Sequence, residues 1–218
     1  MYNEIKYLVQ KEWMLEMKLK YSINGILLYV ASTVFICFLS FRQIIDPPTW
    51  NALFWIILLF AAINAVAKSF LQESRGRQLY MYTMVSAQSL ILSKIIYNLL
   101  LMFVISLVNL FFYSLFLGNM VQDMPMFLIG LLLGSAGFAS VLTMISAIAS
   151  KAGNNATLMA ILSFPILLPI LLTIMKFSKN AMDGLDASVN YQLIMLLFAL
   201  NAMVITLSFL LFPYLWRE

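Results

Sequence analysis

The sequence contains no histidine and a single cysteine, Cys37. Without histidine, the chain lacks the commonest haem axial ligand and the usual side chain for proton transfer near neutral pH. A lone cysteine cannot form a disulfide within the chain, and Cys37 stands inside a long apolar run, where a packed thiol is its ordinary role. We therefore expect this chain alone to have no catalytic residue, no metal site and no cofactor-binding site.

Charged side chains are also scarce. Only 10% of the 218 residues are charged, 63% are apolar, and the mean hydropathy is +0.96. A soluble domain has about 25% charged and about half apolar residues, so this composition indicates an integral membrane protein. The net charge of +4 does not indicate nucleic acid as a partner, because basic residues beside membrane spans ordinarily contact anionic lipid headgroups.

Several motifs that carry chemistry are missing from the sequence. It has no G-x-x-x-x-G-K-[ST] nucleotide loop, no cluster of histidine and cysteine, and no nucleophile elbow. The chain is therefore not expected to be an enzyme. If its function uses ATP, a separate partner ATPase must hydrolyse it.

Long apolar runs are what the sequence does contain. A transmembrane helix needs roughly 20 apolar residues, and polar breaks such as Asp46-Pro47-Pro48 separate the runs. The first run is too long for a signal peptide and follows a charged segment. The sequence predicts one all-α membrane domain over residues 1–218, with six spans at about 22–41, 50–67, 95–117, 126–149, 157–175 and 190–212.

The distribution of lysine and arginine predicts the orientation of the spans. With the N-terminus inside, ten basic residues lie on the inner side and three, Arg42, Lys176 and Lys179, lie on the outer side. Cytoplasmic loops carry the excess of basic residues, so both termini are expected in the cytoplasm. Position 74 should then be accessible from the cytoplasm, and Asp123 and Ser178 from the opposite side.

Two polar segments are expected at the cytoplasmic surface. Residues 1–20 have the spacing of an amphipathic helix lying in the membrane interface, although a charged leader that orients the first span is an alternative. In residues 69–93, we expect a turn at Arg75-Gly76 and a short amphipathic surface helix over Leu79 to Leu92 before the third span. The arginines there either contact a soluble subunit or only bind lipid headgroups.

Small residues and prolines mark the fourth and fifth spans. Gly130, Gly134 and Gly137 allow close approach of another helix, either from this chain or from a second subunit. Pro165 and Pro169 lie four residues apart, and each removes a backbone donor, so a kink is expected, with gating as a further role.

The pattern Phe70-x-x-Glu73-x-x-Gly76-x-x-Leu79, followed by Leu92-Ser93-Lys94, resembles the family of haem exporter protein B (CcmB) of cytochrome c maturation. The small residues of the fourth span, the residues at its end and the pair of prolines in the fifth span also match the pattern of this family. The resemblance implies an ABC-2-like permease subunit in the bacterial inner membrane. It assigns contact with the ATPase to Phe70, Glu73, Arg75, Gly76, Arg77 and Leu79.

The same resemblance implies the partners of the chain. They are a cytoplasmic ABC ATPase, a second copy of this subunit, a membrane haem-handling subunit, a periplasmic haem chaperone and membrane lipid. The complex would export haem or release the haem-loaded chaperone, and any bound haem would lie at an interface with partner subunits. Two alternatives share the architecture, namely a general ABC-2 exporter of a lipid, glycan or drug, and a membrane assembly scaffold that transports nothing.

Overall fold

The computed structural model describes residues 2–18, 21–41, 45–66, 70, 84–151 and 156–217. These residues form helices and contain no strand, which confirms the all-α prediction. Six of the helices are long and apolar enough to span a membrane, as predicted. The helices are α1 Tyr2–Lys18, α2 Tyr21–Phe41, α3 Pro47–Val66, α6 Ala87–Leu117, α7 Met124–Lys151, α8 Ala156–Met182 and α9 Ala187–Arg217.

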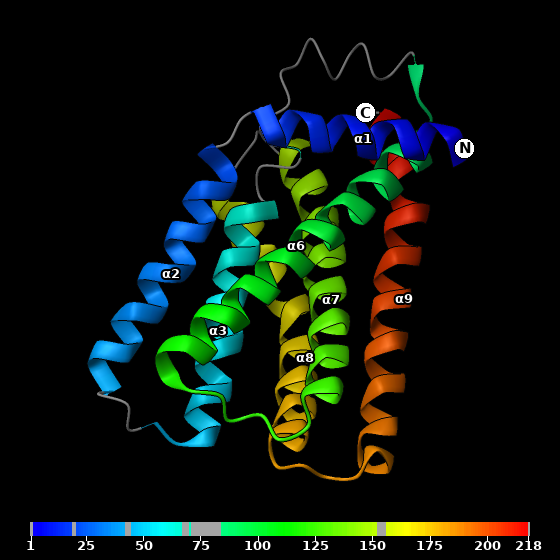
Figure 1. The fold of residues 1–218 in the computed structure, drawn as a ribbon. Helices are drawn as coiled ribbons and strands as arrows, with labels where there is room; N and C mark the ends of the chain where they lie inside the picture. The colour runs from blue at the N-terminus through cyan, green and yellow to red at the C-terminus, as the bar shows by residue number, and fades with distance from the viewer. Residues whose placement is uncertain are drawn as a thin grey trace.

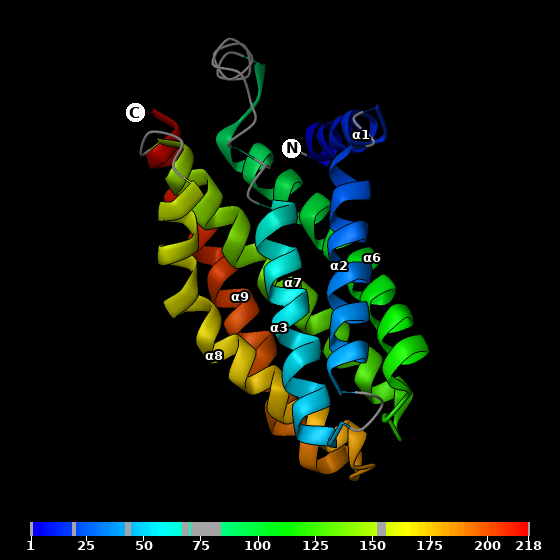
Figure 2. The same ribbon diagram turned by 90° about the vertical axis from the view of Figure 1, so that its left-hand side faces the viewer.

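The six long helices form a bundle, and α1 lies across one end of it (Figures 1 and 2). Both chain termini lie at this end, which we call the α1 end. Helix α7 packs against α3, α6, α8 and α9, so it is the centre of the bundle. Helices α2 and α9 bury the smallest share of their apolar spans, as expected for helices that face lipid.

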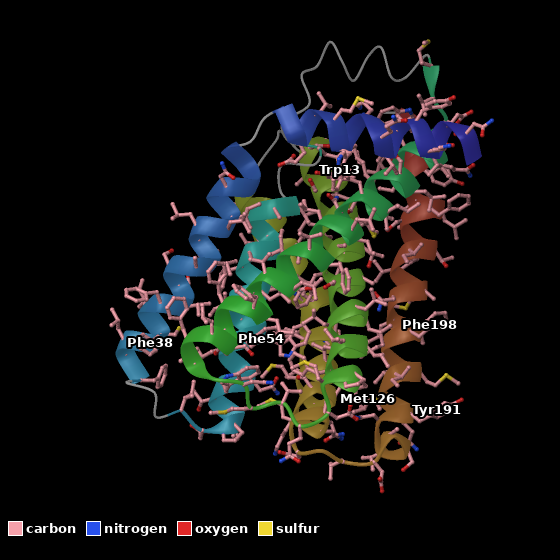
Figure 3. All side chains as sticks on the ribbon, viewed as in Figure 1. Trp13, Phe38, Phe54, Met126, Tyr191 and Phe198 are labelled. Carbon is pink, nitrogen blue, oxygen red and sulfur yellow. The ribbon has the colours of Figure 1, made fainter. Side chains whose placement is uncertain are left out.

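The core of the bundle is built around aromatic side chains of α3. Trp50, Phe54 and Trp55 are fully buried, and the Phe54 ring lies 5.5 Å from the rings of both Tyr113 and Phe127. These pairs have the edge-to-face geometry that aromatic rings favour. Figure 3 shows Phe54 inside the bundle, whereas Phe198 lies on the outer side of α9 and is largely exposed.

The start of α6 differs from the prediction. The Ser86 hydroxyl accepts a hydrogen bond from the Ser89 amide and caps a continuous 31-residue helix that begins at Ala87. The helix of the third span therefore begins earlier than predicted, because residues 87–92, expected in a separate surface helix, are the first turns of α6; residues 79–83 lie outside the described residues. Both polar Ser89 and apolar Leu90 are buried, so the mixed composition belongs to a helix junction and not to a water-exposed surface.

The fifth span also extends further than predicted, because α8 continues to Met182. Ser178 is fully buried in this extension, so the expectation that it is accessible from outside is wrong. The Ser178 hydroxyl donates to Asn51 Oδ1 at 2.7 Å and accepts from Trp55 Nε1 at 2.8 Å. These bonds hold α8 against α3 and remove Ser178 from the surface.

Candidate functional site at the α1 end

A second apolar cluster lies at the α1 end, apart from the main core. It brings together α1, α6, α7, α9 and Phe70, which is the last described residue before the gap at 71–83. The Phe70 ring lies 5.6 Å from the ring of Phe212, which lies 5.5 Å from Trp216. The buried members of this junction cluster are Leu8, Phe70, Leu90, Ile91, Ile95, Ala147, Phe212 and Trp216.

Lys94 is fully buried beside this junction cluster. Its Nζ atom lies 3.5 Å from Glu12 Oε1 of α1 and 4.6 Å from the centroid of the Phe70 ring. A buried ammonium is strongly unfavourable unless it is paired, and an aromatic face adds to its stabilisation. Lys94 therefore joins three parts of the chain: α1, α6 and the end of the segment that follows α3.

A second polar contact joins α1 to Ser86, the residue that caps α6. The Ser86 hydroxyl donates to Glu4 Oε2 at 3.2 Å and lies 2.7 Å from the hydroxyl of Ser89. Hydrogen bonds from the Ser89 side chain, and then from Ser86, lower the pKa of the Glu4 carboxyl below its ordinary value of 4.5. Glu4 is therefore ionised at neutral pH and can hold the α6 cap.

Most of the residues predicted to contact an ATPase cannot be placed. Phe70 lies in the junction cluster, but Glu73, Arg75, Gly76, Arg77 and Leu79 are outside the described residues. Sequence reasoning missed the contacts of Lys94, which it used only as one of the inner basic residues and as part of the Leu92-Ser93-Lys94 pattern. The signal was present in α1, where Glu4, Leu8 and Glu12 recur every four residues and so share one helix face.

The three glycines of α7 lie against side chains of this same chain. An ideal Cβ at Gly130 would lie 2.5 Å from the Phe177 ring, and one at Gly134 would lie 2.8 Å from the Trp55 ring. At Gly137, the nearest atoms belong to Ile170 and Asn201, at 2.8 and 3.3 Å. The glycines thus give α3, α8 and α9 room to approach α7 closely.

The two prolines lie within α8, which remains helical across both. The Thr173 hydroxyl donates to the Pro169 carbonyl at 2.7 Å. Figure 2 shows α8 changing direction along its length. A gating role for these prolines stays a prediction.

Among the described residues, no three His, Cys, Asp or Glu side chains come close enough together to hold a metal ion.

The six long apolar helices define a multi-span helical membrane protein. Residues 5–214 match the family described as CcmB protein, and the chain belongs to this family. The family comprises the membrane subunit of the haem export system of cytochrome c maturation and not an enzyme. No curated protein matches the chain.

Proposed function

We propose that this chain is the transmembrane subunit of an ABC-type complex that exports haem or releases a haem-loaded chaperone during cytochrome c maturation. The family match over residues 5–214 is the observation that carries the proposal. A separate cytoplasmic ATPase supplies the energy, because the sequence has no nucleotide-binding loop. Haem is the cargo here and not a resident cofactor of this chain.

The α1 end faces the cytoplasm in this proposal. The excess of lysine and arginine on the side of the termini supports this orientation. The segment from Phe70 to Leu79 then contacts the ATPase, with Glu73, Arg75 and Arg77 meeting complementary charges. The position of Phe70 in the junction cluster supports the proposal, since force applied to the segment would reach α1, α6 and α9 through this residue.

The proposed complex has further members. A second copy of the chain completes the membrane part, and a membrane haem-handling subunit and a periplasmic haem chaperone act on its other side. The absence of histidine supports haem ligation by those partners and not by this chain alone. The exposed apolar side chains of α2, α8 and α9 suit contact with lipid or with another membrane subunit.

Two substitutions in the proposed contact segment test this function. Glu73→Lys reverses a charge and Gly76→Val would hinder the turn predicted there, while neither reduces the basic excess that directs insertion. Both variants should reach the membrane at normal levels, lose the ATPase in a pull-down and fail to mature cytochrome c. Charge-assisted contacts are worth about 1.5–3 kcal/mol each, so loss of one should weaken assembly roughly tenfold or more.

A charge change at the opposite end of the bundle provides the control. Lys179 is exposed near the end of α8, and Lys179→Glu should keep both the ATPase and cytochrome c maturation. If Glu73→Lys and Gly76→Val behave like this control, the segment is a membrane anchor and the proposed coupling role is wrong.

A further inference from the structure

Helix α1 packs against the start of α6 through residues that recur every four positions on both helices. Glu4 contacts Ser86, and Glu12 contacts Lys94, with the same separation of 82 residues along the chain in both pairs. Leu8 and Leu90, which share that separation, both lie in the junction cluster. Rows of residues four apart pack into each other in the commonest class of helix contact. The two helices therefore pack in register, with a polar pair, an apolar pair and a charged pair in succession along the contact.

The contact extends one further turn along α1. The Glu16 carboxylate lies close enough to the side chain of Tyr97, which is buried in α6, to act on it electrostatically. The three glutamates described in α1 thus all act on α6, Glu12 and Glu16 from half-buried positions and Glu4 from an exposed one, while Lys6, Tyr7 and Gln10 of α1 are exposed. This division of side chains shows that α1 is docked on the protein through a specific polar face, in addition to any contact with lipid.

The docked helix holds both ends of the segment between α3 and α6. At one end, Lys94 bridges Glu12 of α1 and the Phe70 ring. At the other end, Glu4 holds Ser86, the residue that caps α6. The chain therefore leaves and re-enters the bundle at two points that are both fixed by the same face of α1.

We infer that α1 is the positioning element of the ATPase contact, with Glu4, Glu12 and Lys94 as its positioning residues. The inference rests on the proposed function, because it assigns α1 the task of holding the ends of the contact segment. Lys94 has the central part, since its ammonium is fully buried and is stabilised by Glu12 and Phe70 together. Separating Glu12 from Lys94 would remove a carboxylate from a fully buried cation at a cost in free energy, so this contact holds α1 against α6 and Phe70.

A distance measurement tests the docking of α1 without the ATPase. Spin labels at Gln10 and Gln88, both exposed, report on α1 and α6 in the full chain with Cys37→Ala. The parent should give one narrow distance distribution. Glu12→Lys places two ammonium groups together and should broaden the distribution, whereas adding Lys94→Glu restores opposite charges and should narrow it again.

Lys11→Gln is the matched control, because Lys11 Nζ lies 3.2 Å from the same Glu12 carboxylate but belongs to α1 itself. It should leave the distance unchanged. Since α1 lies at the end of the bundle, Glu12→Lys should still reach the membrane, and its loss of stability should be confined to the contacts of α1 and Lys94. A narrow distribution in Glu12→Lys, or a broad one in Lys11→Gln, would overturn the inference.

Assays on the assembled complex separate this inference from the proposed function. Glu12→Lys should reduce cytochrome c maturation about tenfold, as expected for loss of one charged contact, and the double variant should recover it in part because a carboxylate then lies beside Phe70. If Glu12→Lys broadens the distance distribution but leaves cytochrome c maturation unchanged, α1 does not position the ATPase contact. If the parent itself retains no ATPase, the proposed function fails, while the distance result still decides whether α1 is docked.

Discussion

Ser178 shows how single residues satisfy buried polar groups inside the bundle. Its hydroxyl accepts from Trp55 Nε1 and donates to Asn51 Oδ1, and Asn51 Nδ2 donates to the Met175 carbonyl at 2.7 Å. Ser178 is fully buried, and buried polar groups need such partners within the protein. This network therefore fixes the contact between α3 and α8 by geometry as well as by apolar packing.

Removal of this hydroxyl should destabilise the protein. Ser178→Ala leaves the Trp55 indole N–H and the side-chain oxygen Oδ1 of Asn51 without their buried partner, at a cost of about 1–3 kcal/mol. Thermal unfolding in detergent should show a lower midpoint. Ser32→Ala is the control, because the Ser32 hydroxyl is exposed and donates to the Tyr29 carbonyl of its own helix at 3.1 Å. An equal loss in both variants would contradict the role of the network.

Gly134 offers a second test at the residue scale. Gly134→Ala places a methyl group 2.8 Å from the Trp55 ring, which cannot easily move because Ser178 holds its indole nitrogen. Overpacking of this kind costs typically about 1–3 kcal/mol, so the unfolding midpoint should fall. Gly25→Ala has no atom within 4 Å of the added carbon and should not destabilise the protein. Parent-like stability of Gly134→Ala would show that α7 and α3 are not tightly packed there.

At the scale of the element, Ser86 combines two tasks. It caps α6 and donates a hydrogen bond to Glu4, and a serine cap is worth about 1 kcal/mol. Ser86→Ala should therefore loosen the start of α6 and also release α1. Amide hydrogen exchange should rise in both segments, whereas Ser86→Thr, which keeps the hydroxyl, should stay close to the parent. Exchange that rises in α6 alone would show that the contact with Glu4 does not hold α1.

The lowered pKa of Glu4 gives the contact a pH dependence. Because the carboxylate gains hydrogen bonds on docking, its contribution is fully present above the ordinary value of 4.5 and is lost as pH falls through the lower, docked pKa. The distance between labels at Gln10 and Gln88 should broaden below about pH 4.5. This broadening should be smaller in Glu4→Gln, which cannot change charge; an equal response would assign the effect to other groups.

The elements could be predicted to different degrees from the sequence. Six apolar runs predicted the long helices correctly, because length and hydropathy largely determine which segments can span a membrane. The start of α6 and the burial of Ser178 were not predicted, since both depend on partners far away in the chain, Glu4 and Trp55. Lys94 was missed for the same reason: charge counts treat every lysine alike, and only its three-dimensional neighbours distinguish it.

At the scale of the whole molecule, apolar side chains occupy both the interior and the outside. The α3 and α7 helices bury the largest share of their apolar spans, while large exposed apolar side chains are most numerous on α2, α6, α8 and α9. Figure 3 shows Tyr191 and Phe198 on the outer side of α9, and Trp13 on the bundle side of α1. An aromatic residue of an interfacial helix suits the boundary between headgroups and acyl chains. The shape is thus consistent with a membrane whose plane runs beside α1.

The orientation in that membrane is the remaining property of the whole molecule to test. In a Cys37→Ala background, single cysteines replace Met84 near the α1 end and Lys179 near the opposite end, both of which are exposed. A charged, membrane-impermeant thiol reagent added outside the cytoplasmic membrane should label position 179 and leave position 84 unlabelled until the membrane is opened. The ten-to-three excess of basic residues predicts this result. Labelling of position 84 from outside would place α1 and the junction cluster on the wrong side for a cytoplasmic ATPase, so the proposed function would fail together with the predicted topology.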